Sequence, residues 1–392
     1  MGNRVLMVAT VPSMIGQFNM SNIHILLEMG YKVDVAADFT DISIWPAERI
    51  RKFKSQMKEL DVECIQLDFS RSPLKLKKHL KSYKEIIELI EKRKYSFIHT
   101  HTPIASAIVR QAAHKTGTKV IYTAHGFHFY DGAPLKNWLV FYPIEKYLSR
   151  YTDILITINK EDYNRAKKEF HAKKTVYVPG VGVDTEKFAP RQSGREKIRK
   201  ELGVLDDRWL LLSVGELNEN KNHGSVIMAL AGMKNITYVI VGKGEKKKEL
   251  EKVAKECRVD LRLPGFRTDV ADFYDAADIY ILPSLREGLN VSLMEAMASA
   301  LPCLCGDIRG NVDLIEQEKG GFLFKPDEVG SIRSAIEKVV ALNSDERTEQ
   351  GCYNLKKIRD FDLQTVDEIS SEIYRKWYEP SCRDYESSGE KM

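Results

Sequence analysis

Two glutamates in the segment 283–300, Glu287 and Glu295, have the residue type and spacing of a ligand-binding pair. Glu287 precedes Gly288, and Glu295 lies in a run of small and apolar residues that predicts a helix. At 3.6 residues per turn, Glu295 returns near the face on which Glu287 starts. Gly288 allows a ligand close to the backbone, and the N–H groups at a helix start suit a phosphate. Carboxylates instead accept hydrogen bonds from hydroxyls, as on a sugar and a ribose. The alternative is one solvated and one helix-capping glutamate.

Lys221 and His125 are the other candidates for chemistry. Lys221 follows Gly215 after an apolar run, and a fixed cation there would stabilise negative charge on a leaving phosphate. His125 directly follows the run 120–123, and polar groups at the carboxyl ends of parallel strands build the sites of α/β proteins. The plain alternatives are a surface lysine and a structural histidine.

Short apolar runs alternate with amphipathic stretches along the chain, which indicates parallel sheets with crossover helices. We expect strands at 4–9, 32–36, 62–67, 97–100, 120–123, 154–158, 175–178, 209–214, 236–241, 261–263, 279–282 and 302–305. We expect helices near 19–29, 47–60, 74–93, 104–116, 160–170, 331–341 and 363–378. The fold class is therefore α/β, with two doubly wound Rossmann-like domains facing a cleft that holds the active site.

A turn-rich connector, Pro179-Gly-Val-Gly-Val-Asp184, separates the two halves of this pattern. It predicts a first domain over 1–183 and a second over 184–361. The amphipathic stretch 362–379 is expected to return to the first domain as a helix, and the polar residues 380–392 to form a flexible tail.

The composition is that of a globular protein, because 43% of the 392 residues are hydrophobic and 30% are charged. No run of 18 apolar residues occurs, which excludes a transmembrane helix. The net charge of +4 divides into +9 for residues 1–185 and −5 for residues 186–392. This asymmetry favours an anionic partner for the first half, with a chance distribution as the alternative. Nucleic-acid binding lacks a supporting motif, and no divalent-metal signature is evident.

The Glu-x7-Glu spacing, with Glu287-Gly-Leu before the helix and Glu295-Ala-Met-Ala inside it, closely resembles the retaining glycosyltransferases of family 4, which have the GT-B fold. The resemblance extends over nearly the whole chain. Further matching pieces are Thr123-Ala-His-Gly126, Pro179–Asp184, Ser213-Val-Gly-Glu-Leu217 with Lys221-Asn222, Val241-Gly-Lys-Gly244 and Gly320-Gly-Phe-Leu323. The residue sequences of 123–130 and 215–223 are similar to those of the subgroup that builds bacterial exopolysaccharide and capsule repeat units.

The resemblance implies a role for each candidate residue. It implies catalytic roles for His125, Lys221 and Glu287, with Lys221 on the diphosphate and Glu287 on the donor sugar. It implies that Glu295 binds the ribose of the nucleotide. The other residues it assigns to the nucleotide-sugar are Gly16, in a loop after the first strand, Gly215, Gly288, Leu289 and Asn290. Gly265 and Phe266 follow an expected strand and are expected to line the base pocket, with a plain turn as the alternative.

One departure from the family pattern concerns the diphosphate. The family often has an arginine where this chain has Glu216, and that arginine assists the lysine. Arg286 and Arg267 are the candidates to replace it.

The resemblance implies a hexosyl- or N-acetylhexosaminyltransferase. Such an enzyme transfers a sugar from a nucleotide diphosphate sugar, with retention of the anomeric configuration and without a metal, and uridine is the expected base. The acceptor is expected to be a sugar on polyprenyl diphosphate, in the first domain, and the nucleotide-sugar is expected in the second. No cofactor is expected. The basic stretch 71–84 suggests a cytoplasmic protein, peripheral on the inner face of the cell membrane. The alternatives are a sugar-nucleotide 2-epimerase or hydrolase of the same fold and a non-catalytic nucleotide-sugar-binding protein.

Overall fold

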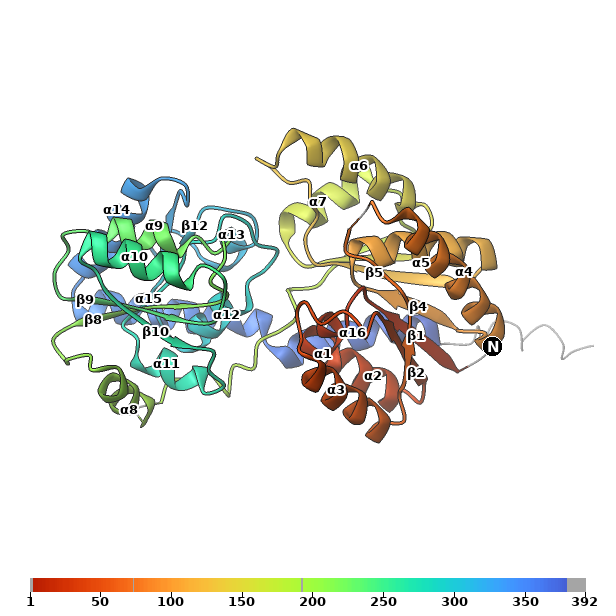
Figure 1. Cartoon of the computed structure of the whole chain (residues 1–392), viewed down its shortest axis with the longest axis horizontal. Helices are drawn as coiled ribbons and strands as arrows, with labels where there is room; N and C mark the ends of the chain where they lie inside the picture. The colour runs from red at the N-terminus through yellow and green to blue at the C-terminus, as the bar shows by residue number, and fades with distance from the viewer. Residues whose placement is uncertain (1–2, 73, 192, 379–392) are drawn as a thin grey trace, which may run out of the picture. The chain divides into compact units, whose positions relative to one another are not determined.

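The computed structural model describes residues 3–72, 74–191 and 193–378, and these form two compact units. The first unit takes in residues 3–158, 162–181 and 364–378, and the second takes in 159–161 and 182–363. Each unit is a sheet with helices on both faces (Figure 1). The tail expected at 380–392 lies outside the described residues.

The first unit is built on a parallel sheet of seven strands in the order β3-β2-β1-β4-β5-β6-β7. Its strands are β1 (Arg4–Val8), β2 (Lys32–Ala37), β3 (Glu63–Gln66), β4 (Phe97–Thr100), β5 (Lys119–Ala124), β6 (Ile154–Thr157) and β7 (Lys174–Tyr177). Its helices are α1 (Pro12–Phe18), α2 (Met20–Glu28), α3 (Ala47–Glu59), α4 (Leu76–Arg93), α5 (Pro103–Thr116), α6 (Leu135–Ser149), α7 (Lys160–Glu169) and α16 (Leu363–Tyr378).

The last helix, α16, belongs to the core of the first unit although it follows the whole second unit in sequence. Val366, Ile373 and Tyr374 pack among the buried side chains of β1 and β4. The hydroxyl of Tyr374 forms a 2.8 Å hydrogen bond with Nδ1 of His99. Helix α16 thus covers β4, near the strand end that carries His99.

The second unit is built on a parallel sheet of six strands in the order β10-β9-β8-β11-β12-β13. Its strands are β8 (Trp209–Val214), β9 (Ile236–Val241), β10 (Asp260–Gly265), β11 (Ile279–Leu282), β12 (Cys303–Gly306) and β13 (Gly321–Phe324). Its helices are α8 (Ser193–Leu202), α9 (His223–Ala229), α10 (Lys247–Cys257), α11 (Val270–Ala276), α12 (Val291–Ala298), α13 (Asn311–Leu314), α14 (Val329–Ala341), α15 (Ser344–Lys357) and the 3-10 helix η1 (Ile358–Phe361).

The two parallel α/β sheets confirm the predicted fold class, and the elements that lie where none was expected include helix α1, strand β13 and helix α6. Helix α1 has only seven residues and begins at Pro12. Strand β13 contains Gly321, whose φ of +143° is open mainly to glycine. Helix α6 contains Pro143 and exposes an apolar face, so it lacks the periodicity of an ordinary surface helix.

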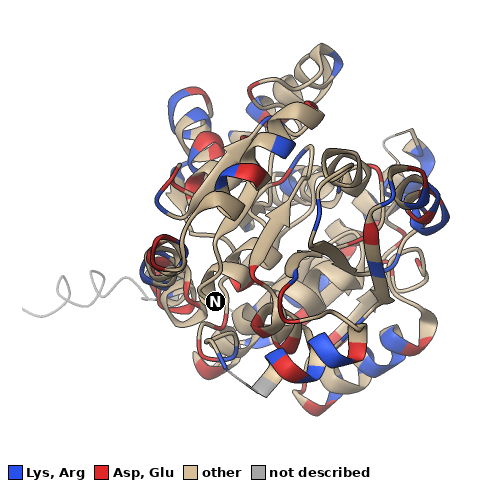
Figure 2. Ribbon diagram, turned by 90° about the vertical axis from the view of Figure 1, so that its left-hand side faces the viewer, with Lys and Arg blue, Asp and Glu red and all other residues tan. Residues whose placement is uncertain are grey.

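Positions of Lys or Arg and of Asp or Glu are interspersed along the helices (Figure 2). Within the described residues, no helix combines the length and the apolar character that crossing a bilayer requires.

Candidate functional site

Two loops of the second unit converge at the carboxyl edge of its sheet. They follow β8 and β11, which are neighbours although the chain passes from β8 to β9 on the opposite side. Such a switch point is where open α/β sheets bind ligands. The N–H of Leu285 donates to the carbonyl oxygen of Asn220 (2.8 Å), and the Asn220 amide donates to that of Arg286 (3.0 Å). These bonds join the two loops side by side.

Lys221 and Glu287 meet at this junction. Lys221 Nζ lies 2.7 Å from Glu287 Oε1, and the two side chains are only 17% and 13% exposed. A Cβ on Gly215 would lie 3.3 Å from Cε of Lys221, so the glycine leaves room for the lysine side chain. The structure therefore places three of the predicted site residues together.

A third loop, which follows β12, adds Arg309 to the same place. Its Nε and Nη2 each donate to the carbonyl oxygen of Glu287 at 3.3 Å. Gly310, with a φ of +82°, packs so closely that a Cβ there would lie 2.0 Å from the carbonyl oxygen of Gly288. Sequence reasoning missed Arg309. The signal in the sequence was its position shortly after the expected strand at 302–305.

The two arginines proposed to replace the family arginine have different surroundings. Arg267 is paired with Glu201 at 2.6 Å and with Asp269 at 2.8 Å, so two carboxylates already hold it. Arg286 lies in the loop that carries Glu287 and is exposed. Its Nε donates to Oδ1 of Asn220, in the loop after β8, at 3.2 Å. Arg286 and Arg309, and not Arg267, are thus the arginines that flank Glu287.

The residues after Glu287 set the start of helix α12. The side chain of Asn290 caps the helix by accepting from the N–H of Leu293 at 3.2 Å. The hydroxyl of Ser292 donates to the carbonyl oxygen of Val214 at 3.0 Å, which ties α12 to the end of β8. Leu289 packs against the core below. This anchoring fixes the Gly288–Asn290 backbone beside the ion pair.

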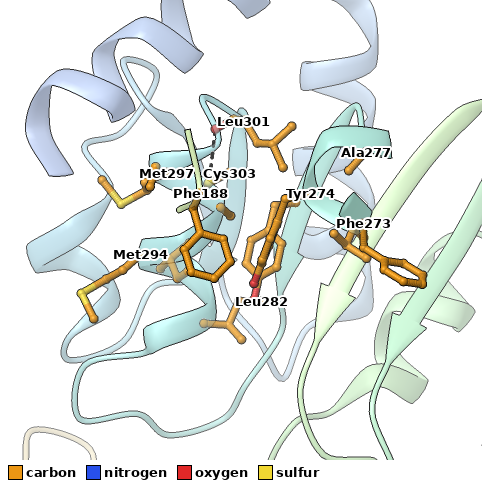
Figure 3. Close-up of a cluster of buried hydrophobic side chains, with 14 of the residues drawn as sticks. Phe188, Phe273, Tyr274, Ala277, Leu282, Met294, Met297, Leu301 and Cys303 are labelled. Atoms are coloured by element: carbon orange, nitrogen blue, oxygen red, sulfur yellow. Dashed lines mark hydrogen bonds between the residues drawn. The ribbon is translucent and has the colours of Figure 1, made fainter. Parts of the chain in front are cut away.

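Glu295 lies on α12, over the hydrophobic core. The hydroxyl of Tyr274 donates a 2.8 Å hydrogen bond to its Oε2. Burial raises the pKa of the Glu295 carboxyl to about 7, against the lowering effects of this bond and of Lys187. Tyr274 is held by Phe188, edge to face at 5.7 Å, among apolar side chains of α12 (Figure 3). The carboxyl therefore titrates near neutral pH in a fixed position.

Phe266 is an exposed aromatic ring at the carboxyl end of β10. It follows Gly265, whose φ is +83°, and the residue is 58% exposed. The amide N–H of Gly242 donates to the carbonyl oxygen of Gly265 at 3.0 Å, and Lys243 Nζ lies 5.8 Å from the centre of the Phe266 ring. Such a ring offers a flat apolar surface for stacking.

His125 and Gly16 belong to the first unit. His125 follows β5, and its Nε2 lies 3.5 Å from Nδ1 of His101. It lines a small cavity of about 30 Å³ together with Phe18 and Thr123. Burial lowers the pKa of His125 to about 4, so its imidazole is neutral at physiological pH.

Gly16 does not lie in a loop, as was expected, but inside helix α1. A Cβ at Gly16 would lie 2.4 Å from Cη2 of Trp45 and 3.0 Å from Cδ2 of Phe53. Packing against these two rings therefore accounts for the glycine. The expectation was wrong because Pro12 begins a helix immediately after Val11.

Among the described residues, no three His, Cys, Asp or Glu side chains are grouped so as to hold a metal ion. The pair Asp360 and Asp362 has Asp-x-Asp spacing, but it lies at η1. There Asp362 accepts a 2.5 Å hydrogen bond from the hydroxyl of Thr185, which supports a turn.

Comparison with known proteins gives matches over both units. The family model described as glycosyl transferases group 1 matches residues 194–356, and the model described as glycosyl transferase 4-like matches residues 19–159. The putative glycosyltransferase EpsD of Bacillus subtilis is 33% identical over 350 residues, which are 86% of this chain and 88% of that protein. An Escherichia coli protein named UDP-Gal:alpha-D-GlcNAc-diphosphoundecaprenol alpha-1,3-galactosyltransferase is 30% identical over 309 residues, 76% of this chain and 79% of that one. The crystal structure of HepE from Anabaena in complex with UDP and glucose has the same fold, with a TM-score of 0.76 at 18% identity, over 95% of this chain and 99% of that one.

Proposed function

The chain belongs to the family 4 glycosyltransferases, and from this premise we propose that it moves a sugar from a UDP-sugar to a lipid-linked sugar acceptor. The transfer retains the anomeric configuration, needs no metal and serves bacterial surface polysaccharide synthesis. The observation that carries the proposal is the ion pair of Lys221 and Glu287 at the switch point of the second sheet.

In this proposal the ion pair is the empty form of the donor site. A bound diphosphate pairs with Lys221 in place of Glu287. The Glu287 carboxylate can then accept hydrogen bonds from hydroxyls of the donor sugar. Arg309 and Arg286 flank Glu287 and add positive charge that this chain lacks at Glu216. The Gly288–Asn290 backbone lies beside the sugar.

The nucleoside extends from this point toward Glu295 and Phe266. The Glu295 carboxylate accepts from the ribose hydroxyls, and the exposed Phe266 ring stacks on the base. The UDP in the crystal structure of HepE supports uridine as that base.

The reaction breaks the bond between the anomeric carbon and the terminal phosphate oxygen. The acceptor oxygen forms the new bond to that carbon, and its proton passes to the leaving phosphate oxygen. Lys221 stabilises the negative charge that develops on this leaving group. We also propose that His125, neutral at physiological pH, contacts the donor sugar and the phosphate.

The acceptor is a sugar on a prenyl diphosphate, and the protein works at the inner face of the cell membrane. The printed activity of the Escherichia coli relative supports this class of acceptor. The excess of nine positive charges over residues 1–185 supports an anionic membrane surface as partner.

The experiment compares Lys221→Ala and Glu295→Ala with wild type for UDP binding and for sugar transfer. Lys252→Ala, at an exposed position of α10, is the control. Both site variants should lose transfer by tenfold or more, and full activity in both would contradict the site assignment. Donor hydrolysis without an acceptor would instead favour the epimerase or hydrolase, and binding without turnover would favour the non-catalytic protein.

A further inference from the structure

Helix α6 of the first unit exposes an apolar face. The exposed fractions are 72% for Leu135, 69% for Leu139, 50% for Val140 and 46% for Ile144. The other exposed positions between Leu135 and Ser149 are Lys136, Pro143 and Tyr147, so none of them is acidic. We call these seven residues the α6 face. A contiguous apolar face of this kind marks an interaction site.

The α6 face cannot turn inward, because the opposite side of the helix is anchored by a buried charge. Glu145 is buried and accepts a 2.8 Å hydrogen bond from Nη2 of Arg110, which is also buried. The hydroxyl of Tyr122 donates to the same carboxylate at 3.3 Å. The helix thus buries its acidic residue and exposes four aliphatic residues, whereas an ordinary surface helix places its charged residues on the exposed face.

A second exposed apolar and basic segment lies at the start of α4. Leu74, Leu76 and Leu80 are exposed there, interspersed with Lys75, Lys77 and Lys78. The acidic groups nearby are already engaged. Asp68 is paired with Lys81 at 2.7 Å. Burial acts to raise the pKa of Asp41, but hydrogen bonds from Ser43 and the charges of Arg71 and Lys78 outweigh it and lower that pKa. The segment therefore keeps a positive charge suited to anionic lipid.

A cavity of about 450 Å³ is lined by Arg71, which precedes α4 in the chain, and by Phe141 of α6. Ile44 also lines it, and the Phe141 ring is stacked on the His128 ring with 4.5 Å between their centres. Thr10 and Thr102, whose hydroxyls are 2.7 Å apart, line it after the carboxyl ends of β1 and β4. The cavity thus has polar groups at the sheet, one exposed cation and an apolar rim.

We propose that the α6 face and the start of α4 dock on an anionic bilayer, and that the cavity lined by Arg71 and Phe141 receives the diphosphate and sugar of a lipid-linked acceptor from that bilayer. Leu139, Val140 and Ile144 enter the interface between headgroups and acyl chains, as the apolar face of an interfacial helix does. Arg71 holds the diphosphate, and the prenyl chain leaves the cavity past Phe141. The acceptor half of this inference rests on the proposed glycosyl transfer, whereas the docking half does not.

The test uses the full chain with vesicles of phosphatidylcholine and phosphatidylglycerol. The variant Leu139→Glu/Ile144→Glu changes the α6 face, Arg71→Ala changes the cavity, and Leu205→Glu is the control at an exposed leucine of the second unit. Co-sedimentation measures docking. Transfer is measured to N-acetylglucosamine diphosphate linked either to a short soluble prenyl chain or to a long chain in vesicles.

The α6 variant should bind vesicles at least tenfold more weakly and lose transfer to the long-chain acceptor, with UDP binding and short-chain transfer unchanged. Arg71→Ala should lower transfer to both acceptors at least tenfold and keep vesicle binding. The docking is overturned if the α6 variant sediments like wild type, or if the α6 face proves to hold two copies together in lipid-free solution. If wild type docks as expected but transfers to neither acceptor, the proposed function fails while the docking surface stands.

Discussion

The hydroxyl of Tyr274, inside the core of the second unit, donates a 2.8 Å hydrogen bond to Oε2 of Glu295. Burial of that carboxyl has a cost, because its pKa of about 7 in the folded protein exceeds the ordinary value of 4.5. The folded state keeps the proton at pH values at which the unfolded chain has lost it. Stability therefore falls as the pH rises from 4.5 to 7.

Glu295→Gln should stabilise the protein relative to wild type at pH 8 more than at pH 5, because glutamine does not ionise. The difference is expected to be about 1–3 kcal/mol in the free energy of unfolding, measured by urea denaturation. Glu256→Gln, on the exposed side of α10, should show no such difference. The same Glu295 variant should lose UDP binding, so that a gain in stability accompanies a loss of function.

Tyr274→Phe tests how the Tyr274 hydroxyl affects the pKa of the Glu295 carboxyl. Loss of the hydroxyl removes a bond that favours the ionised form, so the pKa of Glu295 should rise further. The acid limb of kcat/KM for the donor should move up by about half a unit to one unit. His125 cannot cause that limb, since burial lowers its pKa to about 4. If the acid limb does not move in Tyr274→Phe, ionisation of Glu295 does not control donor binding.

Lys221→Ala should lower kcat by about 10²- to 10³-fold, because the charge on the leaving phosphate loses its fixed cation. It also leaves the Glu287 carboxylate without its 2.7 Å partner. A double-mutant cycle with Glu287→Ala should therefore show coupling in the free energy of unfolding. Additive effects of the two substitutions would mean that the ion pair contributes nothing to the stability of the protein without bound ligand.

The strands were predictable because parallel strands are buried on both faces and read as continuous apolar runs. The run at 97–100 and the run at 279–282 coincide with β4 and β11. Helix α6 was not predictable in the same way. Periodicity assumes that the apolar side of a helix is buried, whereas in α6 Leu139 is exposed and Glu145 is buried.

The candidate site was predictable where one segment carries it and not where several strands meet. Glu287 and Glu295 lie in one short stretch of chain, so their spacing could be identified from the sequence. Arg309 reaches Glu287 only because β12 lies next to β11, an arrangement that the order of residues does not state. The packing of Gly16 on Trp45 likewise depends on a contact distant in sequence.

Arg309 and Arg267 offer a matched test of which arginine serves the diphosphate. Both are arginines at the carboxyl edge of the second sheet, but Arg309 binds the Glu287 backbone and Arg267 is held by Glu201 and Asp269. Arg309→Ala should therefore raise the KM for the donor about tenfold or more, since a charge-assisted contact to phosphate contributes about 1.5–3 kcal/mol. Arg267→Ala should lower the melting temperature and leave that KM unchanged. Steady-state kinetics and thermal unfolding of both variants decide the matter, and the reverse pattern would assign the diphosphate to Arg267.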